Sequence, residues 1–334
     1  MDPFASSIPS FVPKPSLRSG HKMTIYSWGN PRYFPRLPAS TPRFFDVDAE
    51  SRVVAECHWQ PRAREHLTLV VLHGLNGSSD AHYMKGLATK AFARGFNVVR
   101  LNQRNCGGTE HLSVGLFHSG LTADVAHVVH ELSEVDGLTA IAVAGYSLGG
   151  NVALKLAGEY GTHPPRTLRA IAAVSPIIEI ADCIRALEGR GNLLYQWNFV
   201  RDIKRRLRRK ARLRPGLFDL ARLDAVRTIR EFDDAYTAPY FGFRSAEDYY
   251  RRASAMRVID RVSLPTLVIT AEDDPFVPSR PFRDAAITGN PHIDLRLCEH
   301  GGHCGFVGPS SADNDGYWAE NQVVDFVTAA AGAP

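Results

Sequence analysis

The stretch "VAGYSLGGN", residues 143–151, places one serine between glycines at the point where an apolar run ends. The residues before the serine are short and aliphatic, which is typical of a buried strand. After it, Leu148, Val152 and Leu156 recur every four residues, as they do on the buried face of a helix. We therefore expect Ser147 to lie in the turn between a strand and a helix, within the pattern Gly-x-Ser-x-Gly.

A turn this tight has chemical consequences for the serine. It brings neighbouring backbone close together, so residues without a Cβ, Gly145 and Gly149, are needed on either side. It also lifts the hydroxyl clear of the sheet and points the first amides of the helix toward it, where they can stabilise a negatively charged oxygen. The pattern predicts a nucleophilic serine, and the alternative is a glycine-rich turn that contains a serine by chance.

The rest of the chain alternates short apolar runs with stretches of helical length. Near-continuous apolar strands that alternate with helices predict an α/β fold with a mostly parallel, doubly wound sheet covered on both faces. The runs 43–48 and 53–59 predict an antiparallel hairpin at one edge of that sheet. The other expected strands are 67–72, 96–101, 140–145, 169–175, 265–270 and 293–297, and the expected helices are 80–93, 120–135, 148–159, 279–288 and 316–330.

One connection is too long to be a structureless loop. No strand pattern is visible between about Pro176 and Leu264, and the segment is rich in aromatic residues. We expect a helical insertion that caps the carboxyl ends of the strands, where open α/β sheets bind ligands. The expected organisation is an N-terminal extension (1–40), a core (41–176 and 264–334) and a cap (177–263).

A serine hydroxyl needs a base and a group that orients the base. "CEHGGHCGF", residues 298–306, follows the last strand, and its glycine-rich loop favours His303 as the base over His300. Asp273 and Asp274 both end the preceding strand, and on chemical grounds either could orient the imidazole. The order serine, aspartate, histidine is the one expected for this fold.

An oxyanion hole would complete the site. The strand ending in "VVLHGL" places the backbone amide of Leu75 opposite that of Leu148, the residue after the serine. Two amides aimed at one oxygen contribute about 3 kcal/mol each to transition-state stabilisation in well-studied enzymes. His73 is expected to hold this loop rather than to transfer protons.

Other chemistries are disfavoured by the sequence. Cys298, His300, His303 and Cys304 suggest a zinc site, but four ligands within seven residues would be cramped and no usual zinc motif accompanies them. There is no glycine-rich nucleotide-binding loop, so we expect neither cofactor nor metal. The five cysteines are scattered and odd in number, which argues against a disulfide framework.

Charge is concentrated in one segment. Residues 201–214 hold nine Lys or Arg and one Asp, so the rest of the chain carries a net charge of −4 although the whole carries +4. Such local basicity argues against a nucleic-acid-binding domain. The segment is expected to form either a solvated helix or a weak contact with an anionic membrane surface.

Several segments together resemble the YheT-type branch of the α/β-hydrolases. They are "PSLRSGHKMTI", "HGLNGSSDAHYMKGLA", "NQRNCGGTEHLSVGLFHSGLTADV", "GYSLGGNVALKLAGE", "FDDAYTAPYFGFRSAEDYYRRAS", "LPTLVITAEDDPFVP" and "HGGHCGF". The resemblance implies carboxylic-ester hydrolysis without a cofactor, with Ser147 as nucleophile, Asp274 rather than Asp273 as acid, and His303 as base. The sequence departs from the family pattern at Asn105, where the family often has glycine.

The resemblance leaves two alternatives open. One is a lipid or thioester hydrolase, phospholipase-like, that uses the same three residues; the other is a ligand-binding protein of this fold without turnover. The substrate is expected to be a small-molecule or lipid ester. The first residues, "MDPFASSIPSFVP", lack the basic and apolar pattern of a secretory signal, and no apolar run is long enough to span a membrane, so the expected location is the cytoplasm.

Overall fold

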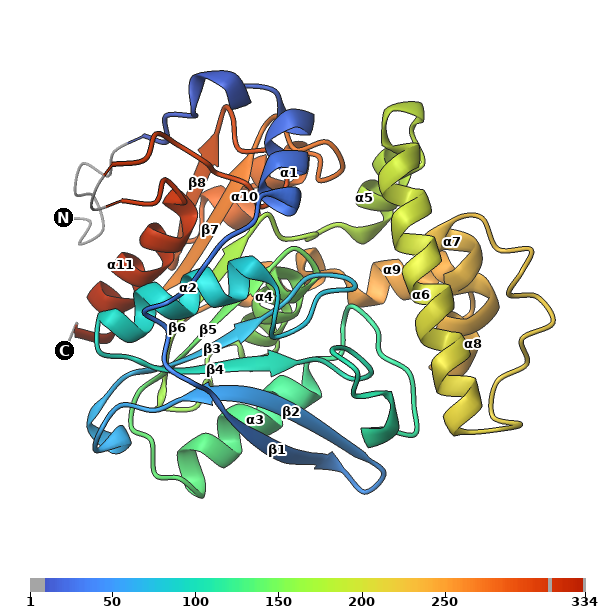
Figure 1. The fold of residues 1–334 in the computed structure, drawn as a ribbon, viewed down its shortest axis with the longest axis horizontal. Helices are drawn as coiled ribbons and strands as arrows, with labels where there is room; N and C mark the ends of the chain where they lie inside the picture. Colours follow the sequence, from blue (N-terminus) through green and yellow to red (C-terminus); the bar gives the residue numbers. More distant parts are fainter. Residues whose placement is uncertain (1–9, 312–313, 333–334) are drawn as a thin grey trace.

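The computed structural model describes residues 10–311 and 314–332, and in that part of the chain eight strands form one sheet in the order β1-β2-β4-β3-β5-β6-β7-β8 (Figure 1). β1 pairs with β2 and β2 with β4 in antiparallel fashion, whereas all other pairs are parallel. The strands are β1 (Thr41–Asp48), β2 (Ser51–His58), β3 (Thr68–Leu72), β4 (Asn97–Asn102), β5 (Ile141–Tyr146), β6 (Leu168–Val174), β7 (Thr266–Ala271) and β8 (Ile293–Cys298). The predicted fold class, including the hairpin at one edge, is confirmed.

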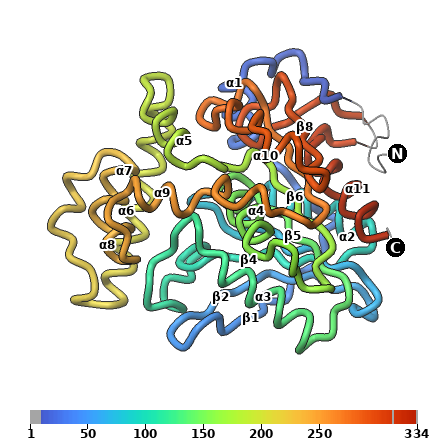
Figure 2. The backbone as a smooth tube through the Cα atoms, turned by 180° about the vertical axis from the view of Figure 1, so that it is seen from behind, coloured from blue at the N-terminus to red at the C-terminus, as the bar shows by residue number. Residues whose placement is uncertain are grey.

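Helices cover both faces of the sheet. α2 (His82–Ala93) and α11 (Trp318–Gly332) pack on one face, in front in Figure 1. α3 (Ala123–Glu134) and α4 (Leu148–Tyr160) pack on the other, and α4 comes to the front when the molecule is seen from behind in Figure 2. Every residue of β3, β4, β5 and β7 is buried because both faces are covered, which explains their near-continuous apolar sequences.

The prediction of one continuous helix over residues 279–288 is wrong. A 3₁₀ turn at Arg280–Arg283 is followed by the short helix α10 (Ala285–Thr288). Asp284 separates them because its backbone is extended, with ψ of 144°, and its side chain accepts a hydrogen bond of 2.8 Å from the amide of Ala286. This aspartate therefore caps a new helix instead of continuing the first one.

The long connection between β6 and β7 is helical, and no strand occurs in it. Figure 1 shows its helices gathered at one side of the sheet, with the long α6 facing the core. A π-helical turn, Asp233–Thr237, joins α7 to α8. The helices are α5 (Ile180–Leu187), α6 (Leu193–Leu213), α7 (Ile229–Phe232), α8 (Ala238–Tyr240) and α9 (Ala246–Ala253). We propose that they form a cap, 177–263, on a core made of 41–176 and 264–334.

The described part of the N-terminal extension packs on the core. It contains a 3₁₀ turn, Pro15–Leu17, and the helix α1 (Gly20–Gly29). Met23 of α1 is fully buried, and the amide of Val307 approaches its sulfur at 3.2 Å. The helix therefore lies against the loop that follows β8, which is the loop of the candidate base.

Candidate active site

The candidate nucleophile lies in a strained turn between β5 and α4. Ser147 has a backbone φ of 54°, which residues other than glycine rarely adopt. Its amide donates a hydrogen bond of 2.9 Å to the carbonyl of Val174. A Cβ on Gly145 would lie 2.1 Å from the carbonyl oxygen of Gly149, and a Cβ on Gly149 would lie 2.6 Å from that of Leu72. Both glycines are required by close backbone contacts, as the sequence pattern predicts.

Three side chains meet above this turn. The Nε2 atom of His303 lies 2.9 Å from the Oγ of Ser147, and its Nδ1 lies 2.8 Å from Oδ2 of Asp274. An ionised carboxylate only accepts, so Nδ1 carries the proton and Nε2 is left free to accept the proton of the serine. The structure thus brings together residues that are 156 and 29 positions apart.

The two adjacent aspartates have separate positions. The side chain of Asp274 is fully buried, and its Oδ1 accepts hydrogen bonds from the amides of Phe276 at 3.1 Å and Val277 at 3.0 Å. Asp273 instead accepts a hydrogen bond of 2.8 Å from the amide of Gly302. Its other oxygen lies 3.4 Å from Nδ1 of His300, so the competing histidine lies next to Asp273, whereas His303 contacts Asp274 and Ser147.

Asp273 holds the backbone of the histidine loop and does not orient the base. Its hydrogen bond to Gly302 instead ties the strand end to the loop that carries His303. Nothing in the local sequence distinguishes these roles, since both carboxylates occupy the same kind of position. The difference comes from which way each side chain points after β7.

The electrostatics of the pair favour a strong base. Burial by itself lowers the pKa of His303, but the neighbouring Asp274 carboxylate more than compensates, and the pKa is raised above its ordinary value. The ring of Phe276 lies 4.1 Å from the imidazole, centroid to centroid, and screens the pair from water. A carboxylate buried next to an imidazole stabilises the imidazolium that forms when the serine loses its proton.

Two supports of the histidine loop come from distant parts of the chain. The amide of His303 donates a hydrogen bond of 2.8 Å to Oγ1 of Thr24 in α1, and that of Cys304 donates one of 3.0 Å to Oγ of Ser175. A Cβ on Gly302 would lie 2.6 Å from the carbonyl of Gly20. The sequence reasoning missed these residues, because no local pattern signals a contact across 279 positions.

The loop after β3 lies directly against the serine. A Cβ on Gly74 would be 3.2 Å from the Cβ of Ser147, and the amide of Gly74 donates a hydrogen bond of 3.1 Å to the hydroxyl of Tyr83. Leu75 and Leu148, the two residues expected to supply amides, both line the cavity that contains Ser147. The first amides of a helix have no partner within the helix, so that of Leu148 can bind a ligand oxygen.

His73 is held inside this loop. Its Nε2 accepts a hydrogen bond of 3.1 Å from the amide of Gln103, and Nδ1 lies 2.8 Å from the carbonyl of Gly74. Burial lowers the pKa of His73 to about 4. A neutral, fully hydrogen-bonded imidazole fits the expected role of holding the loop.

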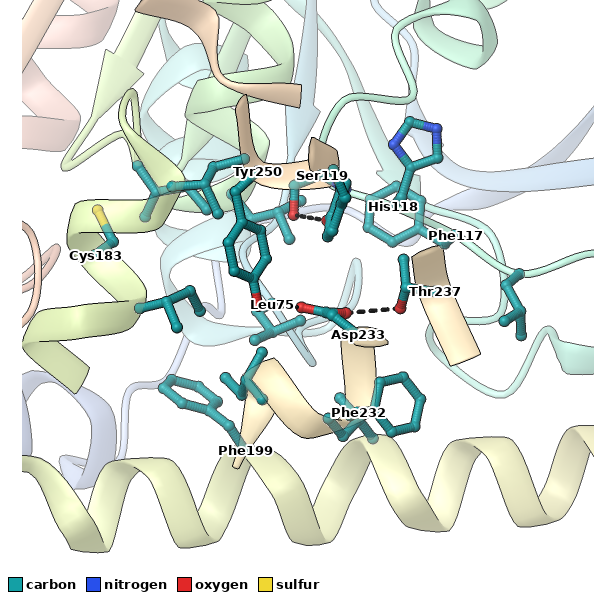
Figure 3. A pocket seen from close by; sticks show the side chains of 18 of the residues that line it. Leu75, Phe117, His118, Ser119, Cys183, Phe199, Phe232, Asp233, Thr237 and Tyr250 are labelled. Carbon is teal, nitrogen blue, oxygen red and sulfur yellow. Dashed lines mark hydrogen bonds between the residues drawn. The ribbon is translucent and has the colours of Figure 1, made fainter. Parts of the chain in front are cut away.

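A largely apolar cavity opens beside the serine and is roofed by the cap (Figure 3). Its polar wall includes Asp233, whose carboxylate accepts hydrogen bonds from Thr237 at 2.7 Å and Tyr250 at 2.8 Å. Burial raises the pKa of Asp233 to about 7, and burial lowers that of His118 to about 4. Most of the remaining wall is aliphatic or aromatic, contributed by Leu75, Leu116, Phe117, Leu148, Ile177, Ile180, Ile184, Leu187, Phe199, Ile203, Leu207, Ile229, Phe232 and Phe276.

Asn105, the position that departs from the family pattern, anchors the cap. Its φ of 62° is left-handed, a conformation that asparagine tolerates better than most residues. Its side chain donates a hydrogen bond of 2.9 Å to the carbonyl of Gly115 and accepts one of 2.8 Å from the buried Nζ of Lys210 in α6. An asparagine therefore keeps the loop shape that glycine would give and adds a contact to the cap.

Two further observations bear on the alternatives. Within residues 10–311 and 314–332, no three His, Cys, Asp or Glu side chains are grouped so that they could hold a metal ion, so the zinc alternative finds no site there. Among the helices of the same residues, none combines the length and apolarity needed to cross a membrane.

The fold, the strained serine turn and the histidine–aspartate pair agree with a comparison against family models. Residues 68–308 match the model of the α/β hydrolase fold. The chain belongs to the α/β-hydrolase family and, within it, to the YheT-type branch.

Relatives of the chain match it to different extents. The Escherichia coli protein named "Putative esterase YheT" is 33% identical over 97% of this chain and 94% of its own. Mouse phospholipase ABHD3 is 30% identical over 72% of this chain, and the match spans 58% of its length. The medium-chain fatty acid ethyl ester synthase/esterase 2 of Saccharomyces cerevisiae is 26% identical over 90% of this chain and 68% of its own.

Solved structures support the fold. The esterase Pf2001 of Pyrococcus furiosus superposes with a TM-score of 0.59 at 15% identity, covering 90% of this chain and 95% of its own. Est1E from Butyrivibrio proteoclasticus gives a TM-score of 0.54 at 17% identity, covering 86% and 98%.

Proposed function

We propose that Ser147, His303 and Asp274 hydrolyse carboxylic esters through an acyl-enzyme formed on Ser147. The protein is an ester-cleaving serine hydrolase of the carboxylesterase type. The observation that carries the proposal is the continuous hydrogen-bonded chain from Ser147 Oγ through His303 to Asp274. Its alternative on the same residues is a lipid or thioester hydrolase.

The reaction follows from the geometry. Nε2 of His303 takes the proton of Ser147 while Oγ attacks the ester carbonyl, and the same nitrogen then gives the proton to the departing alcohol. The negative oxygen of the tetrahedral intermediate would rest on the amides of Leu75 and Leu148. Water, activated in turn by His303, releases the acid and regenerates the hydroxyl. No cofactor or metal takes part in these steps.

The substrate is a small-molecule or lipid ester, and the cavity favours an apolar chain on it. An ester panel from acetyl to palmitoyl should show kcat/KM rising from acetyl by up to about fourfold per added CH₂ until the cavity is filled, since burying each CH₂ contributes about 0.8 kcal/mol. The same chains as thioesters and lysophospholipids distinguish the alternatives. Fastest turnover of the acetyl ester would contradict an apolar acyl site.

The basic segment 201–214 gives α6 a charged outer face, and we propose that this face contacts anionic membrane surfaces. One side of α6 carries two apolar and four basic residues at helical spacing: Leu194, Trp197, Arg201, Arg205, Arg208 and Arg212. Leu194 and Trp197 are 81% and 61% exposed. Exposed apolar and basic side chains on one helix face suit the boundary of an anionic bilayer.

Vesicle sedimentation tests this contact. Arg201→Gln/Arg205→Gln should bind vesicles containing phosphatidylserine about tenfold or more weakly than the unaltered protein, since each basic residue contributes about 1 kcal/mol near such a surface. Arg62→Gln/Arg94→Gln removes the same charge away from the cap and should bind normally. Equal binding to neutral and anionic vesicles would contradict the proposal. The expected cytoplasmic location stays a prediction.

A further inference from the structure

The inner face of α6 carries a cation that the proposed reaction does not use. The side of α6 that lines the cavity beside Ser147 carries five residues at helical spacing: Phe199, Ile203, Arg206, Leu207 and Lys210. Three of them are apolar, as expected for a cavity wall. Arg206 and Lys210 place positive charge in the same wall.

The two cations differ in what they bind. Nζ of Lys210 donates to Oδ1 of Asn105 and to two backbone carbonyls, those of Glu110 and Ser113, so its three protons are used. Among the residues that the structure describes, Arg206 donates a single hydrogen bond, of 3.0 Å, from Nη2 to Oδ1 of Asn76. Its Nε is buried and has no hydrogen-bond partner in that part of the chain.

Arg206 also lacks a carboxylate. Within residues 10–311 and 314–332 no acidic group lies within ion-pair distance of it, whereas neighbours in the same segment are paired: Arg205 with Asp202, Arg208 with Asp224, and Arg209 with Glu110. A half-buried guanidinium with unused donors is costly unless a ligand completes it. Such a group at a cavity wall therefore points to an anionic ligand.

The guanidinium is hydrogen-bonded to the loop that carries the proposed oxyanion donor. Its partner Asn76 directly follows Leu75, the proposed oxyanion donor, and Asn76 also donates a hydrogen bond of 3.1 Å to the carbonyl of Phe199 in α6. Arg206, Leu75 and Ser147 line one cavity. An anion bound at Arg206 would therefore belong to the same molecule whose ester reaches Ser147.

The other charged groups on the cavity wall favour an anion there too. Asp233 is the acidic residue of this wall, and burial raises its pKa to about 7, so part of its charge is lost at neutral pH. His118 is neutral because burial lowers its pKa to about 4. Lys210, whose pKa burial lowers to about 8, and Arg206 are the basic residues of this wall, which favours an anion over a cation there.

We propose that Arg206 is a specificity-determining residue that binds an anionic group, carboxylate or phosphate, on the ester substrate. The inference rests on the proposed function, because it assigns the substrate class of the same site. Arginine suits this role since its planar donors match the oxygens of either group. The apolar part of the cavity then takes the rest of the chain.

Matched substrates test the proposal. p-Nitrophenyl monoesters of adipic and suberic acid carry a free carboxylate, and their methyl esters are neutral counterparts of nearly the same size. Octanoyl glycerol 3-phosphate and octanoyl glycerol form the phosphate pair, so the two pairs distinguish the kinds of anion. The quantity measured is the ratio of kcat/KM for the anionic ester to that for the neutral one.

Arg206→Gln should lower this ratio by about 10- to 100-fold for at least one pair, the range expected for hydrogen bonds to a charged group. Arg206→Lys should keep part of the preference because it keeps the charge. Arg94→Gln is the control: it removes the same charge from the end of α2, where Arg94 pairs with Asp325 at 2.9 Å and does not line the cavity, and it should leave the ratio unchanged. Thermal unfolding verifies that each variant is folded.

The outcomes separate the two proposals. An unchanged ratio in Arg206→Gln, or an equal loss on anionic and neutral esters, overturns the anion site while leaving ester hydrolysis intact. An equal loss would mean that Arg206 only holds Asn76 in place. If the unaltered protein hydrolyses none of these esters, neither the anionic nor the neutral ones, the proposed function itself fails.

Discussion

Replacement of Ser147 by alanine is expected to reduce kcat for p-nitrophenyl esters by about 10⁴- to 10⁶-fold, the range seen when the nucleophile of a serine hydrolase is removed. The proposed acyl-enzyme forms on this hydroxyl, which lies 2.9 Å from Nε2 of His303 and which alanine lacks. Steady-state kinetics at several enzyme concentrations measures the loss.

The folded state should change little in the same variant. Alanine retains the Cβ that the turn already accommodates at φ of 54°, so the midpoint of thermal unfolding should lie close to that of the unaltered protein. Ser133→Ala is a suitable control, because this serine lies on α3 and its exposed hydroxyl donates a hydrogen bond of 3.0 Å to the carboxylate of Glu134. More than about a thousandth of the original activity in folded Ser147→Ala would contradict the proposed nucleophile.

Asp274→Asn should lower kcat by about 10⁴-fold, since an amide in place of the carboxylate holds the wrong tautomer of the imidazole. The pH dependence should change as well. Protonated His303 cannot accept the serine proton, so kcat/KM falls as the pH drops through the pKa of this histidine. Burial lowers that pKa and Asp274 makes the largest contribution that raises it, so removing the carboxylate should lower the pKa and move the acidic limb of the profile to lower pH.

Asp273→Asn provides the matched control at the neighbouring position. Asparagine can still accept the hydrogen bond from the amide of Gly302, so activity should remain within about tenfold and the acidic limb should stay in place. Normal activity in Asp274→Asn together with an inactive Asp273→Asn would move the proposed acid by one residue.

The fold could be predicted from sequence because its signals are local. Strands buried on both faces need continuous apolar runs, and the turn at Ser147 needs Gly145 because a Cβ there would lie 2.1 Å from the carbonyl oxygen of Gly149. The prediction of one helix over 279–288 was wrong for a local reason too, because Asp284 caps a separate short helix.

The parts of the site that could not be predicted depend on distant contacts or on side-chain direction. Thr24 supports the His303 loop from the N-terminal region, and no spacing rule connects the two. Asp273 and Asp274 differ only in the direction of their side chains. Arg206 was hidden in a segment whose composition suggested solvent exposure, although the helical spacing from Phe199 to Lys210 already carried the signal.

The most direct measurement is covalent labelling with a fluorophosphonate, whose phosphorus is attacked by an activated serine with loss of fluoride. The account predicts one adduct per chain, located by peptide mass spectrometry on Ser147, absent from Ser147→Ala and formed much more slowly in Asp274→Asn. A protein that hydrolyses esters while remaining unlabelled, or that carries the adduct on another residue, would contradict it.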